Sequence, residues 1–216
     1  MEVTLMAHRQ AGRLPATLLH RPIRVLRPQD AAGTYAHPPP EFARLDRLGV
    51  LHRLATGYYA AVPDDRIGQP WLPDLESAAL GIAASDEGVG SVALMGLSAA
   101  RIHGAIPRAV GIAIVAAARH RTTIRLLDRA AEVIFVRRDV ARIDVERHTF
   151  ELGQGWVTTV EQTVLDLVAR PGLGGLPDEA AGAIHALLPR ADRELLGDLA
   201  VRQRRKGALA RILRSD

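Results

Sequence analysis

The sequence predicts an α+β protein, in which an N-terminal winged helix-turn-helix domain is followed by a larger mixed α/β domain with a C-terminal helical segment. Three observations predict this fold. Short helices precede a two-stranded hairpin within residues 1–66, which is the order of a winged helix-turn-helix. Apolar strand-like runs alternate with amphipathic helices across residues 71–216. The formal net charge of +4 lies entirely on the first 62 residues.

The composition is that of a globular chain, with 48% hydrophobic and 24% charged residues. The absence of cysteine excludes disulfides, thiolate chemistry and cysteine-based zinc sites. No apolar run approaches the roughly 18 residues that span a bilayer, and the opening MEVTLMAHRQAGR lacks the apolar segment of a secretory signal. We therefore expect a cytoplasmic protein without a membrane partner or a cofactor.

The distribution of charge is more informative than its total. Lys206 is the only lysine, and an arginine-rich chain is also what codon bias in a GC-rich genome produces. Residues 1–62, however, hold eight arginines against four acids, whereas the rest of the chain holds twenty bases against twenty acids. Half of the histidines also lie in the first part, at His8, His20, His37 and His52. This asymmetry is typical of a protein that binds a polyanion at one end.

The N-terminal elements follow in order along the chain. A short helix is expected over 14–19 and ends before Pro22, because proline disfavours helix in the preceding residue. Residues 23–26 are predicted to be extended. A proline and a glycine then bound a second short helix over 29–32. The apolar arms 50–54 and 58–62, separated by three residues that include a glycine, predict a hairpin.

Between these elements lies a third helix, which opens at Pro40 and Glu41 and ends at Gly49. Phe42, Leu45 and Leu48 share one of its faces. We interpret it as a recognition helix and the hairpin as its wing, because a helix fits the major groove while a wing contacts flanking phosphates. The expected DNA contacts are Arg44 and Arg47 on the helix, and His52, Arg53 and Thr56 on the wing. The alternative is that these residues form a solvated surface used for protein contact.

A polar segment over 64–70 is the expected link to the second domain. Beyond it, Thr158 and Glu161 have the spacing of a capping box that opens a helix over 161–169. Residues 178–214 are predicted to be helical and broken near Pro189. Further helices are expected over 73–84 and 98–103, and strands over 91–95, 110–116, 122–126, 132–136, 144–150 and 156–160.

Several fragments resemble catalytic motifs without completing them. Ser98 lies in GLSAA, which lacks the last glycine of a nucleophile elbow, so we expect it to cap a helix. Asp144 and Glu146 have the spacing of a metal-dependent nuclease strand, but no lysine follows them. The loop PGLGGLP follows no strand and holds no lysine, and the later histidines lack metal-ligand spacing. We predict that the protein is not an enzyme and holds no metal.

The last fifteen residues carry a second cluster of cations, interspersed with Leu209, Ile212 and Leu213. Its members are Arg202, Arg204, Arg205, Lys206, Arg211 and Arg214. Such a cluster can serve as a second phosphate contact or as a docking helix for an acidic partner. A solvated terminal helix is the remaining alternative.

The stretch RVLRPQDAAGTYAHPPPEFARLDRLGVLHRLATGYYAAVP resembles the winged-helix domain of AbiEi-type antitoxins, through Gly49, Leu51, Arg53, Leu54, Gly57 and Tyr59. Two later stretches, SVALMGLSAARIHGAIPRA and WVTTVEQTVLDLVARP, are similar to the family's C-terminal domain. The resemblance implies an antitoxin that neutralises a cognate nucleotidyltransferase-like toxin and represses its own operon by binding operator DNA. No catalytic residue of that family transfers to this chain.

Two alternatives remain open at the level of sequence. One is a winged-helix transcription regulator whose mixed domain senses a small ligand and which has no toxin partner. The other is a nuclease or hydrolase that uses the winged helix to find its substrate.

Overall fold

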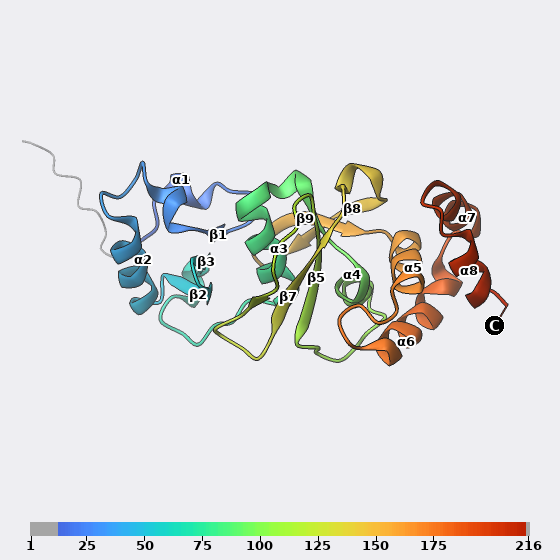
Figure 1. Cartoon of the computed structure of the whole chain (residues 1–216). Helices are drawn as coiled ribbons and strands as arrows, with labels where there is room; N and C mark the ends of the chain where they lie inside the picture. Colours follow the sequence, from blue (N-terminus) through green and yellow to red (C-terminus); the bar gives the residue numbers. More distant parts are fainter. Residues whose placement is uncertain (1–12, 215–216) are drawn as a thin grey trace, which may run out of the picture.

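A computed structural model describes residues 13–214, which form a three-stranded and a six-stranded sheet surrounded by helices (Figure 1). The prediction of a mixed α and β chain is therefore confirmed. The predictions that concern residues 1–12, including the lack of a secretory signal and the position of His8, lie outside the described residues. No helix within residues 13–214 is long and apolar enough to cross a membrane.

The N-terminal part follows the predicted order of elements. The helices are α1 (Ala16–Leu19), a 3-10 turn (Pro28–Ala31) and α2 (Pro38–Arg47), and the strands are β1 (Val25–Leu26), β2 (Leu51–Ala55) and β3 (Tyr58–Ala61). The strands form an antiparallel sheet in the order β1-β3-β2. The first strand thus pairs with the last, and α2 leads directly into the hairpin.

Helix α2 is fixed by the sequence at both ends. Proline suits its first turn, because the amide hydrogen that proline lacks has no partner there. The helix stops before Gly49, whose φ of 68° is a left-handed conformation that glycine adopts easily. Between these ends, Phe42 and Leu45 are buried. The ring of Phe42 packs edge-on against Tyr59 at 5.3 Å, and this contact joins α2 to the sheet.

The larger part contains a six-stranded mixed sheet in the order β6-β7-β5-β4-β9-β8. Pairs β4–β9 and β5–β7 are parallel, whereas β4–β5, β6–β7 and β8–β9 are antiparallel. The strands are β4 (Val92–Leu94), β5 (Ile112–Ala117), β6 (Ile124–Arg125), β7 (Glu132–Arg137), β8 (Val145–Phe150) and β9 (Gly153–Thr158).

Helices cover both faces of this sheet. Ala113 and Val115 of β5 belong to the core beneath α3 (Leu75–Glu87), whereas Ile114 and Ala116 belong to the opposite core. Alternate residues of a strand point to opposite faces, so one apolar strand supplies both cores. The second core is covered by α4 (Gly96–Ile102), α5 (Val160–Ala169), α6 (Pro177–Leu187), α7 (Arg193–Arg202) and α8 (Lys206–Ile212).

Two residues of the larger part that were predicted to cap helices, Thr158 and Ser98, do not do so. The residue that caps α5 is Thr159, whose hydroxyl accepts a hydrogen bond from the Gln162 amide, whereas Thr158 is buried and bonds to Thr163. Ser98 is not a helix cap. It lies inside α4, and its buried hydroxyl accepts a hydrogen bond of 2.8 Å from the backbone amide of Ile114.

The two parts share a core and are not joined by the 64–70 segment alone. Ile23, Val25 and Leu54 of the N-terminal part belong to the same apolar cluster as α3 and the large sheet. Gly81 makes the close approach possible, because a Cβ at this position would overlap the side chain of Val25. The backbone amide of Arg24 also donates to the Leu152 carbonyl at 2.8 Å. The orientation of the N-terminal part is therefore set by packing.

Candidate nucleic-acid interface

The exposed face of α2 is the first candidate surface, and the amphipathic pattern of the helix creates it. Since Phe42 and Leu45 face the core, Arg44 and Arg47 point outward, toward the other side of the helix. Leu48, which was expected to share the apolar face, is instead 47% exposed and ends the outward face. Figure 1 shows α2 at one end of the molecule, away from the large sheet.

Arg44 is held by an acid of its own helix. Its guanidinium donates to both carboxylate oxygens of Glu41, with Nε and Nη2 at 2.9 and 2.7 Å. The hydrogen bond with Glu41 raises the pKa of Arg44, so the group is charged throughout the working range. The side chain remains 43% exposed. Any anion that Arg44 contacts must therefore compete with Glu41.

Arg47 and Arg53 are less constrained. Arg47 is exposed, and its Nε donates to the Ala43 carbonyl at 3.3 Å, one turn earlier. Arg53 is exposed on β2, where its backbone amide donates to Asp46 at 3.2 Å. This contact brings β2 against the last turn of α2. The Arg53 side chain forms no ion pair or hydrogen bond with a residue of the described part of the chain.

The hairpin differs from the predicted wing in what it contacts. His52 does not face solvent with the arginines: its Nε2 lies 2.8 Å from Asp128 of the larger part, and its ring packs edge-on against Trp71. The expectation that His52 contacts DNA is therefore not supported by its position. Thr56 is exposed in the hairpin turn, beside Gly57.

Asp128 explains why His52 turns toward the larger part. This carboxylate is almost buried and also accepts two hydrogen bonds from Arg129, at 3.1 and 3.0 Å. Burial alone would raise the pKa of Asp128, but the hydrogen bonds from His52 and Arg129 outweigh burial and lower it. The carboxylate is therefore a charged anchor for the hairpin.

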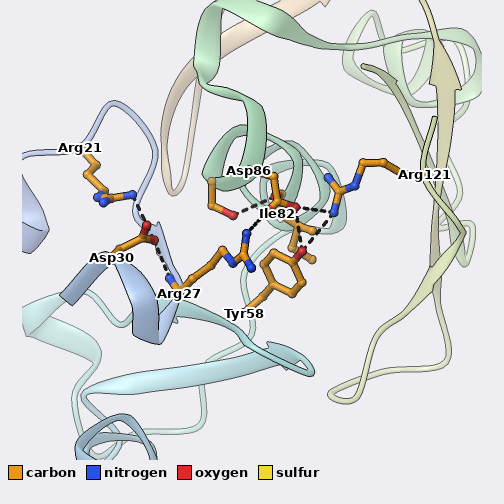
Figure 2. A network of polar contacts seen from close by, with 8 residues as sticks. Arg21, Arg27, Asp30, Tyr58, Ile82, Asp86 and Arg121 are labelled. Atoms are coloured by element: carbon orange, nitrogen blue, oxygen red, sulfur yellow. Dashed lines mark hydrogen bonds and ion pairs between the residues drawn. The ribbon is translucent and has the colours of Figure 1, made fainter. Parts of the chain in front are cut away.

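A second anchor, on Asp86, holds the other strand of the hairpin (Figure 2). The Asp86 carboxylate accepts from the Tyr58 hydroxyl at 2.7 Å and pairs with Arg121 at 2.5 Å and with Arg27. The Arg121 guanidinium also lies 4.0 Å from the ring centre of Phe135. Burial, followed by the hydrogen bond to Asp86, raises the pKa of Tyr58. Four separate segments of the chain thus meet at one carboxylate.

Sequence reasoning missed both anchors. Asp86 lies in the last turn of α3, and no pattern in the sequence marks it as the centre of a polar network. Asp128 follows β6 in a short connection and has no distinctive neighbours in sequence. The only available signal was the aromatic residue at the hairpin, Tyr58, because a buried tyrosine hydroxyl needs a hydrogen-bond partner.

Asp144 and Glu146, the two acids with nuclease-like spacing, make separate contacts. Asp144 accepts a hydrogen bond of 2.9 Å from the Thr159 hydroxyl, at the start of α5. Glu146 is exposed on the edge strand β8, 3.9 Å from His103. Within residues 13–214 no group of three or more histidines and acids is placed to hold a metal ion.

The C-terminal cations lie elsewhere. Arg202 ends α7, Arg204 and Arg205 form the turn after it, Lys206 opens α8, and Arg211 lies near the end of α8. Figure 1 shows α7 and α8 at the end of the molecule opposite α2. The two basic clusters are therefore separate surfaces.

Comparison with known proteins shows a likeness to solved structures. The chain matches no family model and no curated protein sequence. Among solved structures, it is similar to the crystal structure of the RV2827C protein from Mycobacterium tuberculosis, with a TM-score of 0.52 and 19% sequence identity. The match covers 82% of this chain and 66% of that one, slightly less than two thirds of its length. This likeness concerns the fold.

Proposed function

We propose that the protein is a non-enzymatic DNA-binding antitoxin that represses its own operon, with α2 as the recognition helix. The observation that carries the DNA-binding half is the outward cationic face of α2, opposite its buried Phe42 and Leu45. The order of elements and the strand order β1-β3-β2 support a winged helix-turn-helix for this part. The proposed contacts are Arg44, Arg47, Arg53 and Thr56.

The chemistry of these residues suits a duplex. An α-helix fits the major groove, where arginine donates to the acceptors of guanine or to phosphates. Arg53 lies beside the last turn of α2, because its amide bonds to Asp46, and it extends the cationic surface onto the hairpin. The charge surplus of residues 1–62 favours a polyanion at this end.

In this proposal the hairpin makes fewer DNA contacts than a wing that projects freely from its domain. Its strands are anchored at Asp128 and Asp86, and His52 belongs to the first anchor. We therefore leave His52 out of the proposed DNA surface. A fixed hairpin holds α2 in one orientation, which lowers the entropy lost on binding.

The antitoxin half depends on the resemblance of three stretches of sequence to AbiEi-type antitoxins. It assigns neutralisation of a nucleotidyltransferase-like toxin to the larger part. The use of Ser98 and Asp144 in structural hydrogen bonds favours a binding role for that part over a catalytic one. A neighbouring gene for such a toxin would separate this function from that of a ligand-responsive regulator.

The DNA-binding half is tested by titrating the duplex upstream of the gene at several salt concentrations. Each phosphate contact contributes about −0.9 to the slope of log affinity against log salt. The double variant Arg44→Ala with Arg47→Ala is expected to bind at least tenfold more weakly and with a shallower slope. Arg193→Ala, at the start of α7, is the matched control. Unchanged binding by the double variant would refute the recognition-helix assignment.

The antitoxin half is tested by co-expression with the adjacent gene, scored for growth. The full chain is expected to rescue cells from the toxin, and the Arg44→Ala, Arg47→Ala variant is expected to rescue equally well. Loss of rescue in the correctly folded double variant would contradict the proposed division between the two parts.

A further inference from the structure

The turn between α7 and α8 combines a strained backbone with a dense group of cations. Arg204 has a φ of 56°, and within residues 13–214 it is the non-glycine residue with a positive φ. This left-handed conformation follows a helix end, where glycine is the usual residue. Glycine at position 204 would form the same turn without strain. The formation of the turn therefore does not explain the arginine at this position.

Hydrogen bonds on the inner side of the turn hold it in place. Gln203 points inward and donates to the Gln162 side chain at 2.5 Å, while its oxygen accepts from Arg138 at 2.9 Å. Arg138 in turn pairs with Asp166 at 3.1 Å. The inward position of Gln203 leaves its neighbours Arg202 and Arg204 on the outside, where both are exposed.

The cations of this turn have no anionic partner among residues 13–214. Arg202, Arg204, Arg205 and Lys206 form no ion pair or side-chain hydrogen bond with any residue from 13 to 214. The acids Glu194 and Asp198 lie earlier on α7 and form no ion pair with them. Arg211 interacts within the chain and carries no part of the argument.

Apolar side chains are exposed on the same two helices. Val201 is 49% exposed in the last turn of α7, and Leu213 is 48% exposed at the end of α8. A protein interface combines exposed apolar groups with arginine, whereas phosphate binding requires only the cations. Two exposed apolar side chains accompany the cations here, against one, Leu48, on α2, and this larger apolar component favours a protein over a nucleic acid as the partner.

We infer that the α7–α8 turn is a docking surface for an acidic protein, one that presents carboxylates around an apolar patch. Arg204 has a left-handed backbone conformation between the other cations of the turn, and the hydrogen bonds of Gln203 with Gln162 and Arg138 fix the position of the turn. The partner neutralises four cations that form no ion pair within the described residues 13–214. This inference deepens the antitoxin half of the proposed function, on which it depends only for the identity of the partner.

The test uses the full chain and a synthetic helical peptide in which glutamates flank a leucine stripe. Its controls are the same peptide with lysine for glutamate, and duplex DNA. The wild type is expected to bind the glutamate peptide and not the lysine peptide. Arg204→Gly is expected to weaken binding roughly threefold, as for a partly exposed ion pair. Val201→Ser is expected to weaken it by a similar factor, and Arg193→Ala to leave it unchanged.

Folding does not confound this test, because glycine relieves the strain at position 204 and the melting temperature of Arg204→Gly is expected to be equal to or above that of the wild type. Peptide binding that is unchanged in both Arg204→Gly and Val201→Ser would overturn the inference. If the Arg204→Gly variant lost affinity for duplex DNA and kept its affinity for the peptide, the surface would be a nucleic-acid site instead. The Arg44→Ala, Arg47→Ala variant is expected to bind the peptide normally, so failure of the DNA proposal is distinguishable from failure of this one.

Discussion

Arg44 and Glu41 form a two-contact ion pair one turn apart on the exposed face of α2, with donor–acceptor distances of 2.9 and 2.7 Å. The pair places an acid within the surface proposed to bind DNA. Glu41 therefore opposes DNA binding in two ways, by repelling phosphates and by occupying Arg44.

Glu41→Gln is expected to tighten binding to the upstream duplex by about threefold to fivefold at low salt, because it frees Arg44 from its ion pair and removes a negative charge from the surface. Fluorescence anisotropy titrations measure the change. Asp65→Asn, at an exposed acid of the 3-10 turn Asp64–Arg66 that follows the hairpin, is the control with the same charge change. Equal or weaker binding by Glu41→Gln would show that Arg44 does not contact the duplex.

Gly81→Ala is expected to destabilise the protein by about 1–3 kcal/mol, because the added methyl group overlaps the Val25 side chain in a packed core. Urea denaturation measures the loss. Gly182→Ala, in α6, is the matched control: its Cβ meets no atom within 4 Å, so the same substitution is expected to stabilise the helix by about 1 kcal/mol. A neutral Gly81→Ala would mean that α3 and β1 are not in close contact.

Asp86→Ala is expected to cost about 3–5 kcal/mol, because it leaves the largely buried Arg121 without its carboxylate. Tyr58→Phe removes one hydrogen bond from the same group and is expected to cost about 1–2 kcal/mol. Thermal unfolding of the two variants provides the comparison. If Asp86→Ala cost no more than Tyr58→Phe, the carboxylate would not be the centre of this network.

The contribution of Asp128 to stability is expected to depend on pH in a defined direction. Its pKa is lowered in the folded protein, so the unfolded chain binds this proton more tightly. The stabilisation is therefore fully present above the unfolded value of about 3.9 and is lost as the pH falls through the folded value.

Asp128→Asn tests this dependence. At pH 7 it is expected to be less stable than the wild type by about 1.5–3 kcal/mol, the range for hydrogen bonds to a charged group. Denaturant titrations from pH 7 to pH 3 are expected to show this difference shrinking as the carboxylate is protonated. A difference that grows toward acid pH would mean that the pKa of Asp128 is raised.

Much of the fold was predictable from local pattern. The spacing of Phe42 and Leu45 predicted which face of α2 is buried, and the apolar run at 110–116 predicted a strand, which the structure has at Ile112–Ala117. Both follow from periodicity, which depends on residues a few positions apart. The same reasoning placed the α5 cap one residue early, because Thr158 and Thr159 are equivalent in sequence and only burial distinguishes them.

The candidate surface was predictable in part. Arg44, Arg47 and Arg53 were expected to be exposed, and their exposure follows from the same periodicity. The position of His52 was not predictable, because alternation along a strand indicates a face but not what covers it. Its partner Asp128 lies 76 residues away in sequence.

The sequence by itself determined the order of helices and strands, the amphipathic face of α2 and the concentration of positive charge in the N-terminal quarter, because each of these depends on neighbouring residues. The tertiary structure alone decided that the hairpin is anchored at Asp86 and Asp128, that Gly81 lets β1 approach α3, and that Gln203 turns inward beneath Arg204. These contacts join segments far apart in the chain, where burial and hydrogen bonding select among partners that local pattern leaves equivalent.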